Sequence, residues 1–229
     1  MVLPIILGLC GVLCILLRPL RLLAKPQFAG FGSKAFASML FCLAGAAAAA
    51  GRERMNWQAG AMLLGFCLAA VGDILLAVEP ILKNPEKDRA FAFALGGAAF
   101  VLAHGINLAV LCSRTAFHAW LLPLLAALPA LYLLLWRLGI FRPGKAGAPI
   151  VVYALLLSAM LWAAAGIWTR DRVLGSLALP AVILLAFSDT FVFYGQFGAK
   201  KLGSPAFSWL VMFPYYLAQT LMACVIARI

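Results

Sequence analysis

The chain has 229 residues, of which 66% are hydrophobic and only 11% charged, and its formal net charge is +11. A soluble domain is nearer half apolar and a quarter charged, so this chain has too little polar surface to cover itself in water. Its lysines and arginines lie in short segments between apolar runs, where cations meet lipid headgroups, and this placement argues against a nucleic-acid-binding protein.

Eight apolar runs follow one another along the chain, most of them close to the roughly 20 residues that a helix needs to cross a bilayer. We therefore predict an all-α fold, a polytopic transmembrane bundle of about eight helices in a single domain, 1–229. The predicted helices cover residues 2–23, 35–51, 58–78, 90–112, 116–136, 148–168, 173–195 and 207–227. The second run ends in GAAAAAG, whose small residues favour close helix packing.

The distribution of cations predicts an orientation. The loops after the first, third, fifth and seventh predicted helices share one side of the membrane, called side A, and carry 12 of the 18 Lys and Arg residues. Cytoplasmic loops are enriched in these residues. We expect side A to face the cytoplasm, in a bacterial inner membrane.

Two short strings suggest an internal repeat. AAVGDILL resembles LAFSDTFV, which places Asp73 and Asp189 116 residues apart. LAH resembles LAQ, which places His104 and Gln219 115 residues apart. Nearly equal offsets predict two parallel four-helix halves, and the alternative is a chance match between apolar strings.

The strongest chemical signal is the pair of acids, Asp73 and Asp189. Each lies inside an apolar run, five or six residues from its side A end, which is roughly 8–9 Å at about 1.5 Å per residue. A carboxyl at that depth is costly, so it faces the protein interior and usually has a function. The alternative is a structural carboxyl that hydrogen-bonds a neighbouring helix.

Other polar side chains lie within the predicted helices. His104 and Asn107 are one turn apart on one face, although a lone histidine is often only an interhelical hydrogen-bonding group. The eighth helix adds Tyr215, Tyr216 and Gln219, and the sixth adds Tyr153. Shallow tyrosines have an alternative role as interfacial anchors.

Lys25 lies on side A, and its ammonium group suits a phosphate at headgroup level. A cleft open to side A would then present a cation at its mouth, two carboxyls below and neutral polar groups at its floor. Such a cleft fits an amphiphile with a phosphate head and an apolar tail.

Several chemistries lack a motif. The chain has no HExxH, GxSxG or P-loop pattern, and its six cysteines form no CxxC pair. We therefore expect no metal site, no cofactor and no disulfide framework.

The ordered motifs resemble a known family. Lys25-Pro26, LAAVGDILL, Phe100 with His104, Tyr153 with Met160, FSD and YYLAQ occur in that sequence along the chain. Together they resemble the YhhN-like lysoplasmalogenase family of eight-helix membrane proteins. One position departs from the family, which has a tyrosine three residues after the histidine where this chain has Asn107.

The resemblance implies cleavage of the vinyl ether bond of a lysoplasmalogen, a lysophospholipid, to a fatty aldehyde and glycerophosphoethanolamine or glycerophosphocholine. Asp73 and Asp189 would donate the proton and stabilise the oxocarbenium ion. His104, Tyr216 and Gln219 would orient water or the glycerol hydroxyl, and Lys25 would hold the phosphate. The other expected substrate contacts are Asn107, Tyr153 and Tyr215.

Two other readings stay open at this point. The same intramembrane aspartates suit a proton-coupled transporter or a lipid flippase. They also suit a non-catalytic protein in which they join helices. The expected partners are lysophospholipid and membrane lipid, and the sequence leaves the oligomeric state open.

Overall fold

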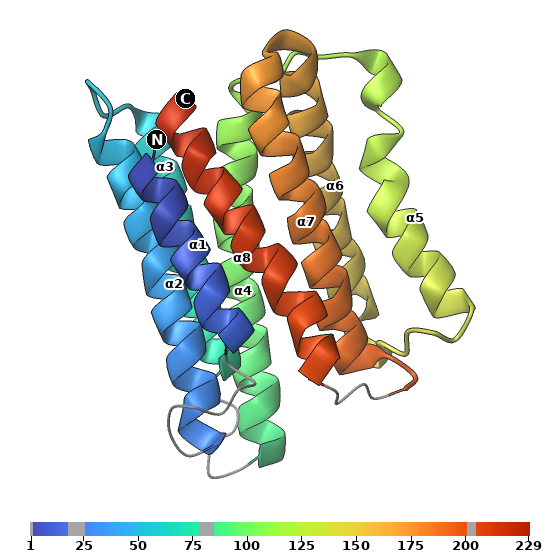
Figure 1. Ribbon diagram of the computed structural model, residues 1–229. Helices are drawn as coiled ribbons and strands as arrows, with labels where there is room; N and C mark the ends of the chain where they lie inside the picture. The colour runs from blue at the N-terminus through green and yellow to red at the C-terminus, as the bar shows by residue number, and fades with distance from the viewer. Residues whose placement is uncertain (1, 18–25, 78–84, 201–204) are drawn as a thin grey trace. The chain divides into compact units, whose positions relative to one another are not determined.

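The computed structural model describes residues 2–17, 26–77, 85–200 and 205–229, and Figure 1 shows their course. These residues form eight α-helices and two short 3-10 helices. The α-helices are α1 (Val2–Leu17), α2 (Pro26–Ala50), α3 (Trp57–Ala77), α4 (Pro85–Cys112), α5 (Leu124–Arg137), α6 (Gly147–Arg170), α7 (Arg172–Phe197) and α8 (Pro205–Arg228). The predicted all-α fold is confirmed.

The helices group into two compact units. Unit 1 comprises Met1–Asn107 and Met222–Ile229, and unit 2 comprises Leu108–Leu221. The division falls inside α4 and α8, so both helices contribute to both units. In unit 1, α2 packs against α1 and α3, and in unit 2, α6 packs against α5 and α7. The single domain over residues 1–229 stays a prediction.

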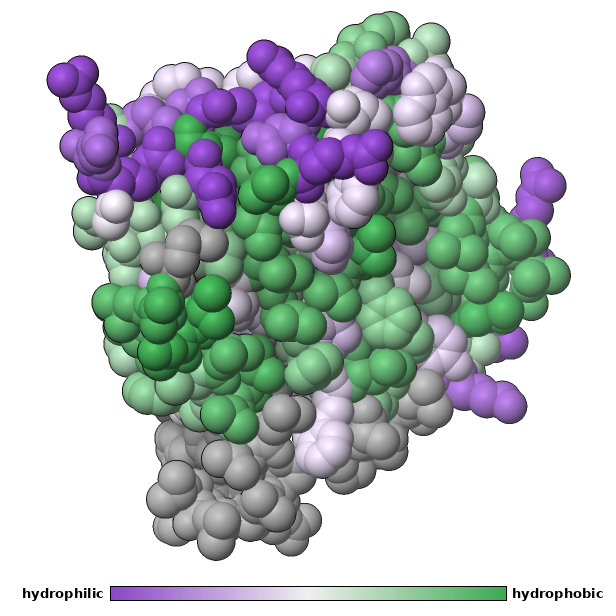
Figure 2. Space-filling model, turned by 45° about the horizontal axis from the view of Figure 1, so that its top comes forward, coloured by the Kyte–Doolittle hydropathy of each residue, from purple (hydrophilic) through white to green (hydrophobic). Residues whose placement is uncertain are grey.

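Seven of the described helical segments are long and apolar enough to cross a membrane, so the chain is a multi-pass integral membrane protein. The described apolar part of α1, Val2–Cys14, is shorter than these seven segments. In Figure 2, hydrophobic residues cover the middle of the visible face and hydrophilic residues gather along its upper edge. This distribution matches a hydrocarbon layer bounded by headgroups.

Two helices begin earlier than predicted, and both begin at a proline. α2 begins at Pro26 and α4 at Pro85, whereas the apolar runs predicted starts at residues 35 and 90. Proline suits the first helical turn because its missing N–H has no partner there and its φ angle is already helical. Polar residues therefore extend both helices beyond their apolar parts.

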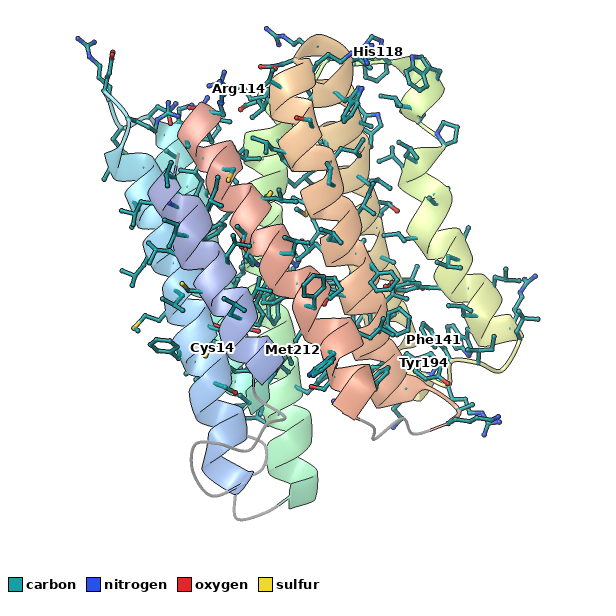
Figure 3. The ribbon with its side chains drawn as sticks, viewed as in Figure 1. Cys14, Arg114, His118, Phe141, Tyr194 and Met212 are labelled. Atoms are coloured by element: carbon teal, nitrogen blue, oxygen red, sulfur yellow. The ribbon has the colours of Figure 1, made fainter. Side chains whose placement is uncertain are left out.

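The fifth helix begins later than predicted, at Leu124 instead of residue 116. The preceding segment is held on α6, because Ala116 N donates to Gly166 O at 3.4 Å and the Thr115 hydroxyl lies 2.8 Å from both Ala163 O and Leu111 O. His118, labelled in Figure 3, also joins α6: its Nε2 donates to Thr169 Oγ1 at 2.7 Å, since the Thr169 hydroxyl itself donates to Gly166 O. These contacts leave only the 3-10 helix η3 (Ala119–Leu121) before α5.

Small residues allow α2 and α3 to approach closely, as the GAAAAAG string predicts. A side-chain carbon added at Gly45 would come within 2.8 Å of the Phe66 ring. Phe66 in turn meets Phe41 edge to face, with ring centroids 5.5 Å apart. The buried alanines Ala44 and Ala48 complete this face of α2. This packing fixes the position of α2 beside the acidic residue of α3.

Candidate functional site

Asp73 lies on α3 in unit 1 and is bound by a side chain of α2. Ser38 Oγ donates to Asp73 Oδ2 at 2.7 Å, and both side chains are buried, with exposed fractions of 0% for Ser38 and 4% for Asp73. The prediction that Asp73 faces the protein interior is confirmed. The hydroxyl fixes the direction of the carboxyl group, which suits either a catalytic or a structural role.

Asp189 lies on α7 in unit 2 and has an equivalent partner on α6. The Tyr153 hydroxyl donates to Asp189 Oδ2 at 2.6 Å, and each side chain is 8% exposed. The alternative role for Tyr153 is that of an interfacial anchor. Its burial and its bond to the carboxylate instead make it part of the surroundings of Asp189.

The two pairs occupy matching positions in their units. Ser38 precedes Asp73 by 35 residues, and Tyr153 precedes Asp189 by 36. In both cases the hydroxyl comes from the helix immediately before the one that carries the acid. This shared order of hydroxyl donor and acidic acceptor along the helices supports the internal repeat that the sequence suggests.

The starts of the acid-bearing helices match as well. Asn56 Oδ1 accepts a bond from Ala59 N at 2.9 Å before α3, and Asp171 Oδ1 accepts one from Leu174 N at 2.9 Å before α7. Such caps satisfy backbone N–H groups that the helix leaves free. Asn56 and Asp171 are 115 residues apart, close to the offset of the two acids.

A second hydroxyl pair lies on the elements beside Asp189 and was missed from the sequence. Tyr132 of α5 is 2% exposed, and its hydroxyl lies 2.9 Å from Thr190 Oγ1. Tyr132 is the donor, because the Thr190 hydroxyl donates to Ala186 O at 2.7 Å. The Phe193 ring meets both Tyr132 and Tyr153 edge to face, with centroids 5.9 and 5.2 Å apart. The sequence did offer one signal for Tyr132. It lies five residues before Arg137, a cation of side A, and this depth below side A matches that of the two acids.

His104 and Asn107 of α4 are buried, with exposed fractions of 1% and 4%. The His104 ring stacks on Phe100, with centroids 6.0 Å apart and an interplanar angle of 29°. Asn107 faces α3, where its Oδ1 atom would lie 3.0 Å from a carbon added at Gly65. Phe100 also contacts α3, because a carbon added at Gly72 would meet its ring at 2.8 Å. The predicted polar stripe of α4 therefore faces the helix that carries Asp73.

The polar residues of α8 are buried too. Tyr215, Tyr216 and Gln219 are exposed by 4%, 1% and 4%, and the two tyrosine rings meet edge to face with centroids 5.0 Å apart. Deep burial opposes the alternative that these tyrosines are interfacial anchors. α8 also joins α7 in unit 2, where Ser188 Oγ donates to Val211 O at 2.8 Å.

Comparison with known proteins identifies the family. The model of the YhhN family matches residues 31–226. The chain belongs to the YhhN family. Searches of curated proteins and of solved structures gave no significant match.

In this YhhN protein, the structure brings each predicted acid together with a buried hydroxyl. Asp73 belongs to unit 1 and Asp189 to unit 2, and each accepts a hydrogen bond from a hydroxyl of its own unit. The predicted phosphate contact, Lys25, lies outside the described residues. Within the described part of the chain, no group of three or more His, Cys, Asp or Glu side chains is placed to hold a metal ion.

Proposed function

We propose that this YhhN protein is an intramembrane hydrolase that cleaves the vinyl ether bond of lysoplasmalogen. The products would be a fatty aldehyde and glycerophosphoethanolamine or glycerophosphocholine. The observation that carries this proposal is the presence of two buried aspartates at matching positions, each fixed by a hydroxyl group. Membership of the YhhN family is consistent with a hydrolase.

The reaction needs an acid and a water molecule. Protonation of the β-carbon of the vinyl ether breaks its double bond and leaves an oxocarbenium ion. Water adds to the cationic carbon and loses a proton, giving a hemiacetal, which collapses to an aldehyde and the glycerol hydroxyl. The proton taken up in the first step stays on the carbon, and the proton that water loses restores the acid, so the net change is the addition of one water molecule.

Two carboxyl groups in one pocket would meet both requirements. Burial and mutual repulsion allow neighbouring carboxyls to hold different protonation states, one as the acid and one as the anion. We propose that Asp73 and Asp189 meet in one pocket and share the roles of proton donor and stabiliser of the cation. Their hydroxyl partners, Ser38 and Tyr153, hold each carboxyl in a fixed orientation.

The remaining polar residues would position the substrate. In the proposal, His104, Tyr216 and Gln219 orient water or the glycerol hydroxyl, and Lys25 binds the phosphate. Asn107 and Tyr215 are further proposed substrate contacts. The pocket would open toward side A on the cytoplasmic face of a bacterial inner membrane, as the excess of cations in those loops indicates.

The decisive experiment incubates the purified full-length protein with lysoplasmalogen and measures released aldehyde by mass spectrometry. A lysolipid with a saturated ether at the same position is the matched control, because it lacks the double bond that accepts the proton. Aldehyde from the vinyl ether and none from the saturated ether supports the proposal. Intact vinyl ether after long incubation with well-folded protein would refute it.

The second candidate is a proton-coupled transporter or lipid flippase. It is favoured by interior prolines in three of the described helices, Pro129 in α5, Pro180 in α7 and Pro214 in α8, because interrupted helices line the binding sites of many transporters. Proton-dependent uptake or lipid translocation in proteoliposomes, without aldehyde release, would support this function instead.

A further inference from the structure

Two connections of unit 2 are joined by backbone hydrogen bonds. Arg142 N donates to Phe197 O at 2.7 Å, and Ala199 N donates to Ile140 O at 2.9 Å. The two bonds form an antiparallel bridge between Phe141 and Gly198. The segment after α5 is therefore fastened to the segment after α7.

This bridge rests on an aromatic core. Gly139, with a φ angle of 69°, ends α5 in a left-handed conformation that turns the chain back. Phe141 is then buried at 3% exposure, with ring centroids 5.7 Å from Tyr132 and 6.1 Å from Tyr194. Figure 3 shows Phe141 and Tyr194 together near the ends of α5 and α7. The burial of Phe141 therefore fixes the backbone positions of its neighbours, Ile140 and Arg142.

Several exposed cations surround the bridge. Arg142 and Lys200 lie in the two bridged segments, Lys145 lies in the short helix η4 (Gly144–Ala146), and Arg137 ends α5. We call these four residues the basic patch. None of them has an ion pair with an acid among the residues that the structure describes.

The sequence explains why these charges are not neutralised within unit 2. Between residues 108 and 221 the acids are Asp171 and Asp189. Asp171 caps the start of α7, whereas the bridge lies beyond the end of that helix. Asp189 accepts the Tyr153 hydroxyl inside the unit. The counter-ion of the basic patch must therefore come from outside unit 2.

Apolar side chains border the basic patch. Leu138 and Ile140 lie between Arg137 and Arg142 in the chain and are 63% and 38% exposed, and Trp136 in α5 is 41% exposed. Phosphate oxygens match arginine and lysine donors, and acyl chains match exposed leucine, isoleucine and tryptophan. A free phosphate ion would use the cations alone, whereas a lipid would use both groups of residues.

We propose that the basic patch binds the headgroup of an anionic phospholipid, with the first part of its acyl chains against Leu138 and Ile140. This site is separate from the aspartates and does not depend on the proposed hydrolysis. Its expected role is to hold unit 2 at a fixed depth in the leaflet that faces side A.

Native mass spectrometry of the full-length protein in an uncharged detergent tests the proposal, with phosphatidylglycerol and phosphatidylcholine as probes. The test variant is R142Q/K145Q. The matched control is R170Q/R172Q, which also removes two exposed cations from unit 2, but at the other end of α6 and α7. With about 1 kcal/mol per cation near an anionic headgroup, phosphatidylglycerol binding should weaken roughly ten- to thirty-fold in R142Q/K145Q alone.

Phosphatidylcholine binding should be the same in all forms, and the charge-preserving variant R142K/K145R should bind phosphatidylglycerol almost normally. The variant D189N should also keep its phosphatidylglycerol binding, which separates this site from the proposed catalytic one. Equal losses in R142Q/K145Q and R170Q/R172Q would show a general charge effect and overturn the proposal. Full competition by inorganic phosphate would overturn the choice of a lipid as ligand.

Discussion

Ser38 and Tyr153 hold equivalent positions 115 residues apart, because each donates its hydroxyl to the Oδ2 atom of an aspartate on the following helix. The equivalence extends to the helix caps Asn56 and Asp171. Each unit therefore contains a complete acid–hydroxyl pair. The predictions below test what each pair does and whether the two pairs act together.

The first prediction concerns the acids. Under the proposed hydrolysis, Asp73→Asn and Asp189→Asn should each lower the rate of aldehyde release by about 100- to 10,000-fold, because an amide supplies neither the proton nor the negative charge. The rate is measured with the purified protein and lysoplasmalogen. Asp171→Asn, which keeps a capping oxygen at the start of α7, serves as the control and should retain activity. Nearly normal rates in both site variants would end the proposed mechanism.

A second prediction concerns the contribution of the two hydroxyl partners to stability. Tyr153→Phe and Ser38→Ala each remove one hydrogen bond to a buried carboxyl group, a change that costs about 1–3 kcal/mol. Both variants should unfold at lower temperature in detergent, as followed by intrinsic tryptophan fluorescence. Tyr153→Phe keeps the ring contact with Phe193, so a loss in this variant reports on the hydroxyl. An unchanged unfolding temperature in both would show that these bonds add no stability.

A third prediction addresses the meeting of the acids. In a protein with its six native cysteines replaced, Asp73→Cys with Asp189→Cys should cross-link through a short bifunctional thiol reagent. A disulfide requires Cβ atoms within about 4.5 Å, so a short linker tolerates the wider spacing of a shared pocket. Gel mobility after proteolysis between the two positions measures the link.

The control for this cross-link pairs Asp73→Cys with Asp171→Cys. Asp171 caps the start of α7, whereas Asp189 lies in the second half of that helix. This pair should stay unlinked. Efficient linking of the control, or none of the site pair, would contradict a common pocket.

A fourth prediction concerns the packing beside Asp73. A carbon added at Gly72 would lie 2.8 Å from the Phe100 ring, whereas one added at Gly105 meets nothing within 4 Å. Gly72→Ala should therefore destabilise the protein by about 1–3 kcal/mol through overpacking. Gly105→Ala should be neutral or stabilising, because alanine loses less backbone entropy in a helix.

Unfolding temperatures of the two glycine variants provide the comparison. Phe100 also stacks on His104, so Gly72→Ala is expected to lower activity as well, while Gly105→Ala keeps it. Equal stability of the two variants would contradict the close contact between α3 and α4.

The burial of the two acids could be predicted from the sequence, for a physical reason. A carboxyl inside an apolar run must be placed in the protein interior, and Asp73 and Asp189 are indeed 4% and 8% exposed. The number of helices followed equally directly from the length of the apolar runs. Both inferences depend on the cost of polar groups in hydrocarbon, which acts on single residues and single segments.

The partners of the acids were harder to predict. Ser38 lies in an apolar run among other small residues, where serine is common and carries no distinct signal. Its bond to Asp73 depends on the rotation of α2 about its own axis, which neighbouring helices determine. Tyr132 was missed for a related reason, because its hydroxyl bonds to Thr190 of another helix. Contacts between helices set these details, and no single segment encodes them.

The matching pairs differ in one respect, since one hydroxyl belongs to an aliphatic alcohol and the other to a phenol. If the two halves descend from a duplicated gene, an ancestral self-paired protein would have carried two identical acids. Fusion into one chain would let each copy mutate alone, so that serine could stand at one position and tyrosine at the other. A phenol is a much stronger acid than an alcohol. The modern chain therefore places its two carboxyls beside hydrogen-bond donors of unequal acidity, which a symmetric homodimer could not do.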